Sequence, residues 1–461
     1  MANMLIKNGT VVFEEEERLA DILIEGEKIA AIYEPGAYEG DAEVLDVTGL
    51  HIFPGSIDPH MHLDNHISLD KAVRIDSKRQ AIGGLTTMVP FVKSTKSYLE
   101  TIPKYQKIME ENSLIDFGLS AFFFAKKHVK EIEEYVEKLG ITSFKFIFDK
   151  QDVVHLWYDI SKEDALTLDK GDFYFILKKL REINEKLVLC VHCEDPDIFR
   201  KLEEDVKNSG MDNYKLETYD HVRPNFVETT TMADTMFLNH VLDGNVYMVH
   251  TASRYSVEMF ETMSKTFPSN YTVETCPQYL TLTVDSPCGI LGKVNPPIHY
   301  KEDVEALWEG IRNGYVHTIG TDNVPAYLEQ KQEKGDDLWA AALGFSTPGL
   351  ILPVLISEGY HKRNIPLHCI ANVTSTNTAR KFLLSTKGEI KPGYDADLAI
   401  VDLEWERTIT PELYGCSDYS IYEGMSFKGW PRYTLSRGEI IQKDGVVTAE
   451  CGRGKYLFRT V

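Results

Sequence analysis

The sequence predicts an α/β protein: a (β/α)8 barrel of the TIM type, with a small β-sandwich domain formed by both chain termini. Short apolar runs alternate with helical patterns through the middle of the chain, as expected for parallel strands buried on both faces. Both ends instead alternate apolar and polar residues between turn-forming pairs, as antiparallel hairpins do. We therefore expect the β domain at residues 1–53 and 389–461, and the barrel at 54–388.

The two ends of the chain share one strand pattern. The N-terminal segments are MLIKNGTVVF, ADILIEGEKIAAIY and EVLDVTGLHIFP, and the C-terminal ones are KPGYDADLAIVDL and YTLSRGEIIQKDGVV. Asn-Gly and Glu-Gly pairs interrupt the first two segments, as turns between strands do. The most economical interpretation is one β domain made from both termini, with the barrel inserted between them.

The barrel strands are expected in eight apolar runs. In chain order these are GSIDPHMHL, LTTMVPFV, DFGLSAFFF, TSFKFIF, KLVLCVHCE, NVYMVHTA, YTVETCP and VHTIGTD. A doubly wound open sheet is the rival interpretation of strands that alternate with helices. No GxGxxG motif follows any of these runs, which weakens a nucleotide-binding version of that rival.

Composition makes several classes of function poor candidates. The 461 residues include 49 basic and 71 acidic side chains, a net charge of −22, and such a surface repels nucleic acid and anionic membranes. No run of eighteen apolar residues is present, so no membrane span is expected. The first residues are too polar for a signal peptide. An odd, scattered set of seven cysteines indicates reduced thiols and a cytoplasmic location.

Six polar side chains lie in or at the ends of five of these runs. They are His60 and His62 in the first run, Lys145 in the fourth, His192 in the fifth, His250 in the sixth and Asp322 in the eighth. The C-terminal ends of barrel strands form the active-site face, and residues two apart on a strand point to the same side. Imidazoles and a carboxylate gathered there are typical of a site for zinc or a similar divalent metal.

Lys145 is the unusual member of this set, because it lies within SFKFIF, a run expected to be buried on both faces. Burial disfavours the ammonium form and frees a neutral amine to react. Carbamylation of that amine by carbon dioxide would give a carboxylate-like bridge between two metals. The alternative is a lysine paired with a nearby carboxylate.

A series of motifs runs through the chain: FPGSIDPHMHLD, SFKFIF, VHCED, HVRPNFVE, VYMVHTAS, VETCPQYLTLT, IGTD, GEIKPGYDADLAIVD and YTLSRGEII. In this order they resemble the amidohydrolase superfamily, and most closely its hydantoinase/dihydropyrimidinase group. The resemblance covers nearly the whole chain. Dihydroorotases usually follow the His-x-His motif with an Arg-Asp-Pro-Gly stretch, whereas this chain reads LDNHISLD, so that activity is not expected.

The resemblance implies a centre of two divalent metal ions, expected to be zinc and bridged by N6-carboxylysine at Lys145. His60, His62 and Asp322 would hold one ion and His192 and His250 the other, with the Lys145 bridge shared. A hydroxide between the ions would attack the substrate carbonyl, and Asp322 would carry its proton to the leaving ring nitrogen. The family commonly forms tetramers, so a homo-oligomer, a tetramer or a dimer, is expected.

The chain departs from the group's pattern in its substrate loops. Five residues after the bridging lysine the group usually has a tyrosine that donates to the oxyanion, and this chain has Lys150. Lys150, Tyr158 and His155 are the alternatives for that donor. Asn323 follows Asp322 where histidine is usual, and NPP at 295–297 and FSTPG at 345–349 replace two substrate-holding loops. The predicted substrate contacts are therefore Asn295, Phe345, Asn323 and His155.

The leading hypothesis is a cyclic amidohydrolase that opens the amide or ureide bond of a five- or six-membered ring of the hydantoin or dihydropyrimidine type. An allantoinase-like activity and the opening of an oxidised purine ring are alternatives. A hypothesis of another class is a non-catalytic scaffold, since the same family contains animal cytoskeleton-regulating relatives that have lost metal ligands. All six expected ligand positions are filled here, which favours an enzyme.

Overall fold

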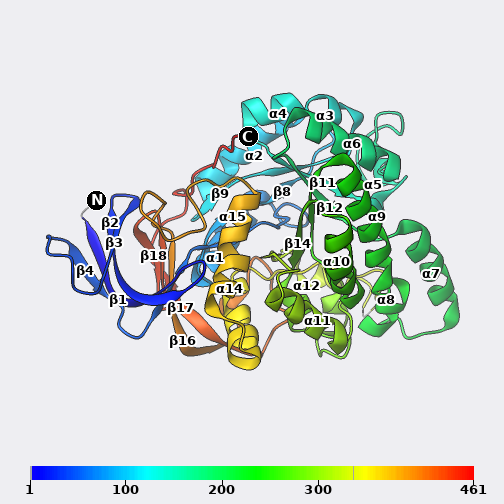
Figure 1. Ribbon diagram of the computed structural model, residues 1–461. Coiled ribbons are helices and arrows are strands. Elements are labelled where there is room, and N and C mark those ends of the chain that lie inside the picture. The colour runs from blue at the N-terminus through cyan, green and yellow to red at the C-terminus, as the bar shows by residue number, and fades with distance from the viewer. Residues whose placement is uncertain (1–2, 336) are drawn as a thin grey trace.

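The β domain joins both ends of the chain in one mixed sheet (Figure 1). The computed structural model describes residues 3–335 and 337–461. The strands of this sheet are β1 (Met4–Val12), β2 (Glu17–Glu25), β3 (Lys28–Tyr33), β4 (Glu43–Asp46), β5 (His51–Pro54), β16 (Leu398–Thr408), β17 (Ser426–Ser436), β18 (Glu439–Lys443) and β19 (Val446–Val447). Their order is β19-β18-β17-β16-β5-β1-β2-β3, with β4 paired to β1. The termini meet where β5 runs antiparallel to β16 and Ile52 lies opposite Ile400.

This domain has a hydrophobic core of its own. Ile6, Ile22, Ile52 and Ile400 are fully buried in one cluster, and Leu435 of β17 joins them. β-Branched side chains pack well on a pleated, half-buried surface. Residues from opposite ends of the sequence therefore share one core, and the expectation of a β domain made from both termini is confirmed.

The barrel is built from parallel strands in the middle of the chain. They are β6 (Ser56–Asp58), β7 (Leu85–Met88), β8 (Phe91–Val92), β9 (Asp116–Phe117), β10 (Ser120–Phe122), β11 (Ser143–Ile147), β12 (Val188–His192), β13 (Asn245–Met248), β14 (Asn270–Thr275) and β15 (Thr318–Ile319). Every predicted run contains one or two of them. A parallel bridge between Met61 and Asn323 places the first run beside the last, as closure of a barrel requires. The predicted barrel is confirmed.

Two barrel strands are interrupted. Pro90 separates β7 from β8, because proline has no amide hydrogen to give to a sheet. The residues around it keep the strand against the first run: Val89 N donates to Asp58 O and Phe91 N to Met61 O. The third run is also divided, into β9 and β10, although it contains no proline; Gly118 and Leu119 lie at the break. In these two runs a second short strand, β8 or β10, therefore continues toward the active-site end of the barrel.

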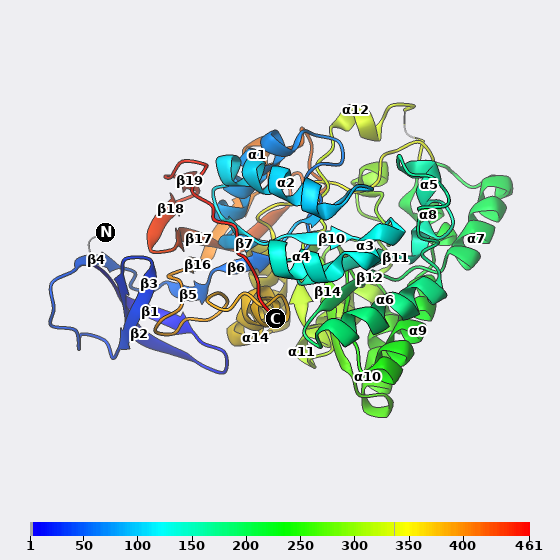
Figure 2. The same ribbon diagram turned by 90° about the horizontal axis from the view of Figure 1, so that it is seen from above.

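Helices surround the strands (Figures 1 and 2). They are α1 (Leu69–Ile82), α2 (Tyr98–Asn112), α3 (Lys126–Lys130), α4 (Ile132–Leu139), α5 (Val154–Trp157), α6 (Lys170–Ile183), α7 (Pro196–Ser209), α8 (Leu216–Val222), α9 (Phe226–Leu242), α10 (Arg254–Thr266), α11 (Lys301–Arg312), α12 (Leu328–Lys331), α13 (Ile351–Val354), α14 (Leu367–Ala371) and α15 (Asn377–Lys381), with π-helical turns at Leu355–His361 and Asn372–Thr376. Figure 2 shows α6, α9 and α10 side by side along the outside of the barrel. No helix in the described part of the chain is long and apolar enough to cross a membrane.

A buried cluster of charges ties the β domain to the barrel. Lys387 Nζ lies 2.7 Å from Asp116 and Asp397 and 3.1 Å from Asp395. Burial alone would lower the pKa of Lys387, but the three carboxylates outweigh it and hold the pKa above its usual value. Arg437 of the β domain donates to the other Asp116 oxygen at 2.8 Å. Lys28, whose Nζ lies 2.6 Å from Asp395, supplies a third cation. Three cations therefore compensate three carboxylates, and each cation is needed for that balance.

We expect Lys387→Met to destabilise the protein by about 3–5 kcal/mol, because it leaves buried carboxylates without their cation. The free energy of unfolding from urea titration followed by circular dichroism measures this change. Lys391→Met is the matched control, since Lys391 pairs with Glu389 at the exposed surface. Equal stabilities of the two variants would contradict the role assigned to Lys387.

Candidate functional site

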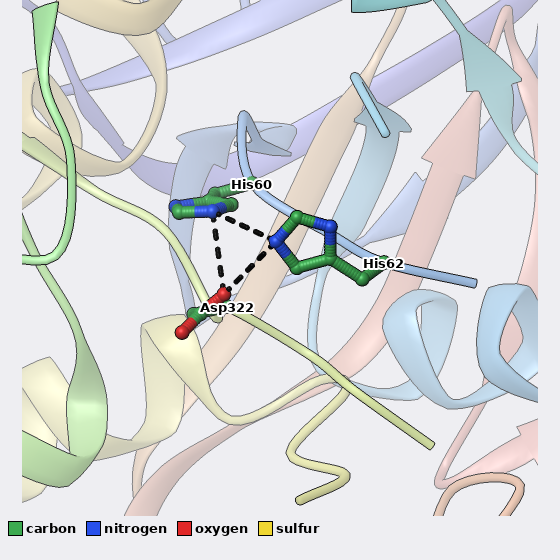
Figure 3. Close-up of side chains that lie close together, drawn as sticks. All are labelled: His60, His62 and Asp322. Atoms are coloured by element: carbon green, nitrogen blue, oxygen red, sulfur yellow. Dashed lines mark hydrogen bonds and ion pairs between the residues drawn. The ribbon is translucent and has the colours of Figure 1, made fainter. Parts of the chain in front are cut away.

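The predicted ligands from the first and last barrel runs lie together (Figure 3). His60 Nε2 is 3.2 Å from both His62 Nε2 and Asp322 Oδ1, and His62 Nε2 is 3.3 Å from the same oxygen. The two histidines follow β6 and the aspartate follows β15, so the three side chains come from the runs that close the barrel. All three are buried. Nitrogen and oxygen atoms that converge in this way can hold a cation.

Lys145 enters this group from β11. Its Nζ lies 3.2 Å from His60 Nε2 and 4.8 Å from the centre of the Phe91 ring. The side chain is 2% exposed, and burial lowers the pKa of its ammonium group. Within residues 3–335 and 337–461, no carboxylate oxygen lies within 4.0 Å of its Nζ. The alternative of an ion-paired lysine is therefore not found, and the amine is available to react.

A second pair of imidazoles lies beside the first group. His192 Nδ1 is 2.9 Å from His250 Nε2. The other nitrogen of His192 lies 2.8 Å from Glu194 Oε2, which also accepts a hydrogen bond from Arg223 at 2.6 Å. Because His192 Nε2 is engaged with a carboxylate, its Nδ1 is left to face the cavity as a ligand. An oxygen of Asp149 lies within 4.8 Å of the ligand atoms of His192 and Glu194.

Glu274 on β14 orients both groups. One of its oxygens lies 2.7 Å from His60 Nδ1 and accepts from the His250 backbone N–H at 2.9 Å. The Tyr247 hydroxyl donates to the other oxygen at 2.7 Å. An imidazole whose Nδ1 bonds a carboxylate presents its Nε2 to a metal. The role of Glu274 was not predicted from the sequence, although an acidic side chain inside the apolar run YTVETCP was a visible signal.

The backbone turns sharply at two of the candidate ligands. His250 has φ 43° and Asp322 has φ 51°, in the left-handed region that costs a non-glycine residue roughly 1–3 kcal/mol. Each residue comes a few positions after a barrel strand, β13 or β15. Strain of this kind persists where the surrounding structure over-determines it, and it clusters at functional sites.

The donor set fits a pair of cations. Burial lowers the pKa of His60, His62 and His250 well below the usual value, so these rings are neutral and offer lone pairs. His60 and His192 each face a carboxylate through one ring nitrogen, which leaves the lone pair of the other nitrogen free to bind a cation. Ring nitrogen together with carboxylate oxygen is the donor set that zinc prefers.

A cavity of about 750 Å³ lies next to these ligands, within the range of small-molecule sites. His62, Lys145, His192, His250 and Asp322 form part of its wall. Aromatic side chains that could hold a ring complete it, namely Phe122, Trp157, Tyr158 and Trp339. A second cavity of about 500 Å³ is lined by none of these residues. The first cavity is therefore the candidate substrate site.

The predicted substrate residues divide into two sets. Lys150, Tyr158 and Asn295 line the cavity, whereas His155, Asn323 and Phe345 are absent from its lining among the described residues. The buried Asn323 amide donates to Asp76 at 2.9 Å and accepts from the Thr347 backbone N–H at 3.0 Å. Its side chain is thus engaged in packing the loops. The structure gives His155, Asn323 and Phe345 no cavity contact, and their substrate-binding roles stay predictions.

The comparisons with known proteins agree with this geometry. The family model described as "Amidohydrolase family" matches residues 51–441. The chain belongs to the amidohydrolase family. It is 31% identical to a D-hydantoinase of Geobacillus stearothermophilus, an alignment that covers 99% of this chain and 96% of the relative. An allantoinase of Deinococcus radiodurans is 28% identical over 99% of this chain and 98% of its own.

Solved structures of this amidohydrolase family share the fold. A crystal structure of dihydropyrimidinase from Brevibacillus agri superposes with a TM-score of 0.89 at 29% identity and covers 99% of both chains. The predicted hydantoinase resemblance is confirmed.

Besides Glu274, two other residues near the candidate ligands, Arg223 and Asp149, were not predicted from the sequence. Arg223 lies in the quoted motif HVRPNFVE, so its position was visible but its contact with Glu194 was not.

Proposed function

We propose that this protein hydrolyses the amide or ureide C–N bond of a five- or six-membered ring of the hydantoin or dihydropyrimidine type. The observation that carries the proposal is the convergence of His60 Nε2, His62 Nε2 and Asp322 Oδ1 within 3.3 Å beside a cavity of about 750 Å³. The D-hydantoinase and dihydropyrimidinase relatives support the ring class.

His60, His62 and Asp322 would hold one divalent ion, His192 and His250 a second, and Lys145 would bridge them; zinc is the proposed metal. A neutral Lys145 amine would add carbon dioxide at Nζ and release a proton, which gives N6-carboxylysine. Its burial and the lowered pKa favour the neutral amine that this addition needs. When bound, two such ions would supply an activated water and polarise the substrate carbonyl.

Asp322 is proposed to move the proton during ring opening. Its Oδ1 lies among the ligand atoms and its side chain lines the cavity, so it can accept a proton from the attacking water. It would then deliver that proton to the ring nitrogen as the C–N bond breaks. The products are a carboxylate and the amine or urea nitrogen of the opened ring, which balances the added water.

Tyr158 is proposed to donate a hydrogen bond to the oxyanion. It lines the cavity and its ring stacks on Phe124 at a centroid distance of 4.4 Å. Burial raises the pKa of Tyr158 to about 12, so the hydroxyl keeps its proton at neutral pH. Lys150, the rival donor, also lines the cavity, but its Nζ lies 3.8 Å from Asp149 and 5.1 Å from the Trp157 ring.

Tyr158→Phe is expected to lower kcat by about 10²–10³-fold with little change in KM, because the lost hydrogen bond acts on charge that develops during the reaction. Steady-state kinetics on the best ring substrate measures this. Tyr33→Phe, in the β domain, is the matched control. A larger loss of kcat in Lys150→Met than in Tyr158→Phe would assign the donor role to Lys150 instead.

The function itself is tested by assaying the zinc-loaded protein against hydantoin, dihydrouracil and allantoin, with loss of ring absorbance and appearance of a carboxylate as readouts. Opening of the hydantoin or dihydrouracil ring supports the proposal. Allantoin as the only substrate would favour the allantoinase-like alternative, which the Deinococcus relative keeps open. If the protein binds far less than one metal ion per chain and opens none of these rings, the non-catalytic scaffold hypothesis is favoured.

Three further expectations belong to this proposal. They are a homo-oligomeric assembly, a cytoplasmic location and domain boundaries near residues 53 and 389. The seven unpaired cysteines are compatible with a reducing compartment. Size-exclusion chromatography with light scattering measures the assembly, and a single subunit mass would contradict it.

A further inference from the structure

The substrate cavity carries more lysine than the proposed reaction uses. Besides Lys145, its wall includes Lys93, Lys150 and Lys293. The whole chain has a net charge of −22, so cations at this place do not follow from the overall composition. The same wall carries Asp64, Asp149 and Asp322, but Asp149 lies beside Lys150 and Asp322 lies among the candidate metal ligands. A lysine of this wall that has no carboxylate in contact can attract an anionic ligand.

Lys93 lies close to the proposed chemistry. It directly follows β8 at the active-site end of the barrel. Its Nζ donates to Asn65 Oδ1 at 2.5 Å and lies 5.6 Å from the centre of the Phe122 ring. The His62 ring lies against the same Phe122 ring at 5.7 Å. The ammonium group is thus a near neighbour of a candidate metal ligand within one cavity.

The charge of Lys93 is poorly compensated. No carboxylate oxygen lies within 4.0 Å of its Nζ in the described part of the chain. Asp64 and Asp322, which also line the cavity, favour the ammonium form from a greater distance, while Lys150 and Lys145 oppose it. Burial is the largest influence and lowers the pKa of Lys93 to about 8. An anion placed at this group would offset the cost of holding a partly buried cation.

The other two lysines have partners already. Lys150 has Asp149 3.8 Å from its Nζ. Lys293 donates to the Ala341 carbonyl at 2.8 Å and is buried, whereas Lys93 is half-buried and so more open to a ligand. Lys93 has the neutral Asn65 amide as its protein partner and shares the Phe122 ring with His62, so it is the cation of this wall best placed to receive a charged group from a ligand.

We propose that Lys93 binds an anionic group on the substrate, so that the preferred substrates are cyclic amides or ureides whose ring substituent carries a carboxylate. This inference rests on the proposed ring-opening function and names its substrate class. A neutral substituent at the same place would cover the ammonium group without replacing its water, which is unfavourable. A carboxylate instead accepts a charge-assisted hydrogen bond.

A pair of substrates that differ in charge alone tests the inference. We would compare 5-(2-carboxyethyl)hydantoin with its carboxamide isostere, 5-(2-carbamoylethyl)hydantoin, using the full-length metal-loaded protein. We expect kcat/KM to favour the carboxylate by about 10- to 100-fold, mainly through KM, with a preference that falls as salt is added. Lys93→Met should reduce that ratio to about 1 or below, and Lys93→Arg should restore most of it. Lys96→Met, at an exposed position on the same loop, should leave the ratio unchanged.

The outcomes separate this inference from the function on which it rests. Opening of both rings without a preference for the carboxylate, or an unchanged ratio in Lys93→Met, overturns the inference and leaves the function standing. If neither ring opens, the proposed function fails for this substrate class, and calorimetric binding of the same two compounds decides the inference. Tighter binding of the carboxylate that Lys93→Met abolishes supports it, and equal binding of the two compounds overturns it.

Discussion

Replacing Lys145 by alanine is expected to remove most of the bound metal and to lower kcat by at least ~1,000-fold, because the bridge between the two ions is lost. The Lys145 amine, 3.2 Å from His60 Nε2, is the group that extends from β11 into the ligand cluster. Elemental analysis of the purified variant measures metal content, and steady-state kinetics on the best ring substrate measures turnover.

A spectroscopic readout separates loss of the bridge from general damage. Protein equilibrated with ¹³C-labelled bicarbonate should show a carbamate carbon signal that Lys145→Ala lacks. Lys138→Ala is the matched control, because Lys138 is exposed on α4 and pairs with Glu134 at the surface. Full metal content and full turnover in Lys145→Ala would refute the assigned role. An unchanged carbamate signal in Lys145→Ala would show that another lysine carries the modification.

The convergence of the candidate ligands was predictable because the pattern of a barrel strand constrains it strongly. His60 and His62 are two residues apart at the end of an apolar run, so they had to share a face. The ends of parallel strands meet on one face of a barrel, which is why Asp322 could be expected beside them although it is far away in sequence. The structure brings these three side chains within 3.3 Å.

The supporting contacts were not predictable in the same way. Glu274 reaches His60 across 214 residues of sequence, and Arg223 reaches Glu194 from a helix end that no periodicity places beside β12. Asn323 could be assigned to the substrate from its position after Asp322, yet its amide is held by Asp76, 247 residues away. Which way a loop side chain turns depends on partners that only the tertiary structure brings close.

The interruptions of the barrel strands show the same limit. Pro90 lies within LTTMVPFV and rules out a continuous ladder of hydrogen bonds there. Where the residues after the proline go can be seen only in the folded structure. Phe91 and Val92, just beyond the proline, form the short β8 in the sheet that contains β10 and β11. Lys93 follows at once, and so it reaches the cavity wall instead of the outer helix layer.

Asp322→Asn is expected to retain more metal than Lys145→Ala and yet to hydrolyse poorly, with kcat lowered by about 10²–10⁴-fold. An amide oxygen can still contribute to a cation site, but an amide cannot accept the proton of the attacking water and pass it on. The left-handed backbone at Asp322, φ 51°, suits asparagine as well as aspartate, so the fold should tolerate this change. Metal content and kcat measured on the same preparation give the two quantities to compare.

Asp64→Asn is the matched control, because Asp64 lines the same cavity without belonging to the ligand cluster. It should change kcat far less than Asp322→Asn does. Retained metal with parental activity in Asp322→Asn would remove the aspartate as proton carrier and leave it as a ligand alone. Loss of metal equal to that in Lys145→Ala would mean that the charge of Asp322 holds the ion, and the proton would then have to move through another group.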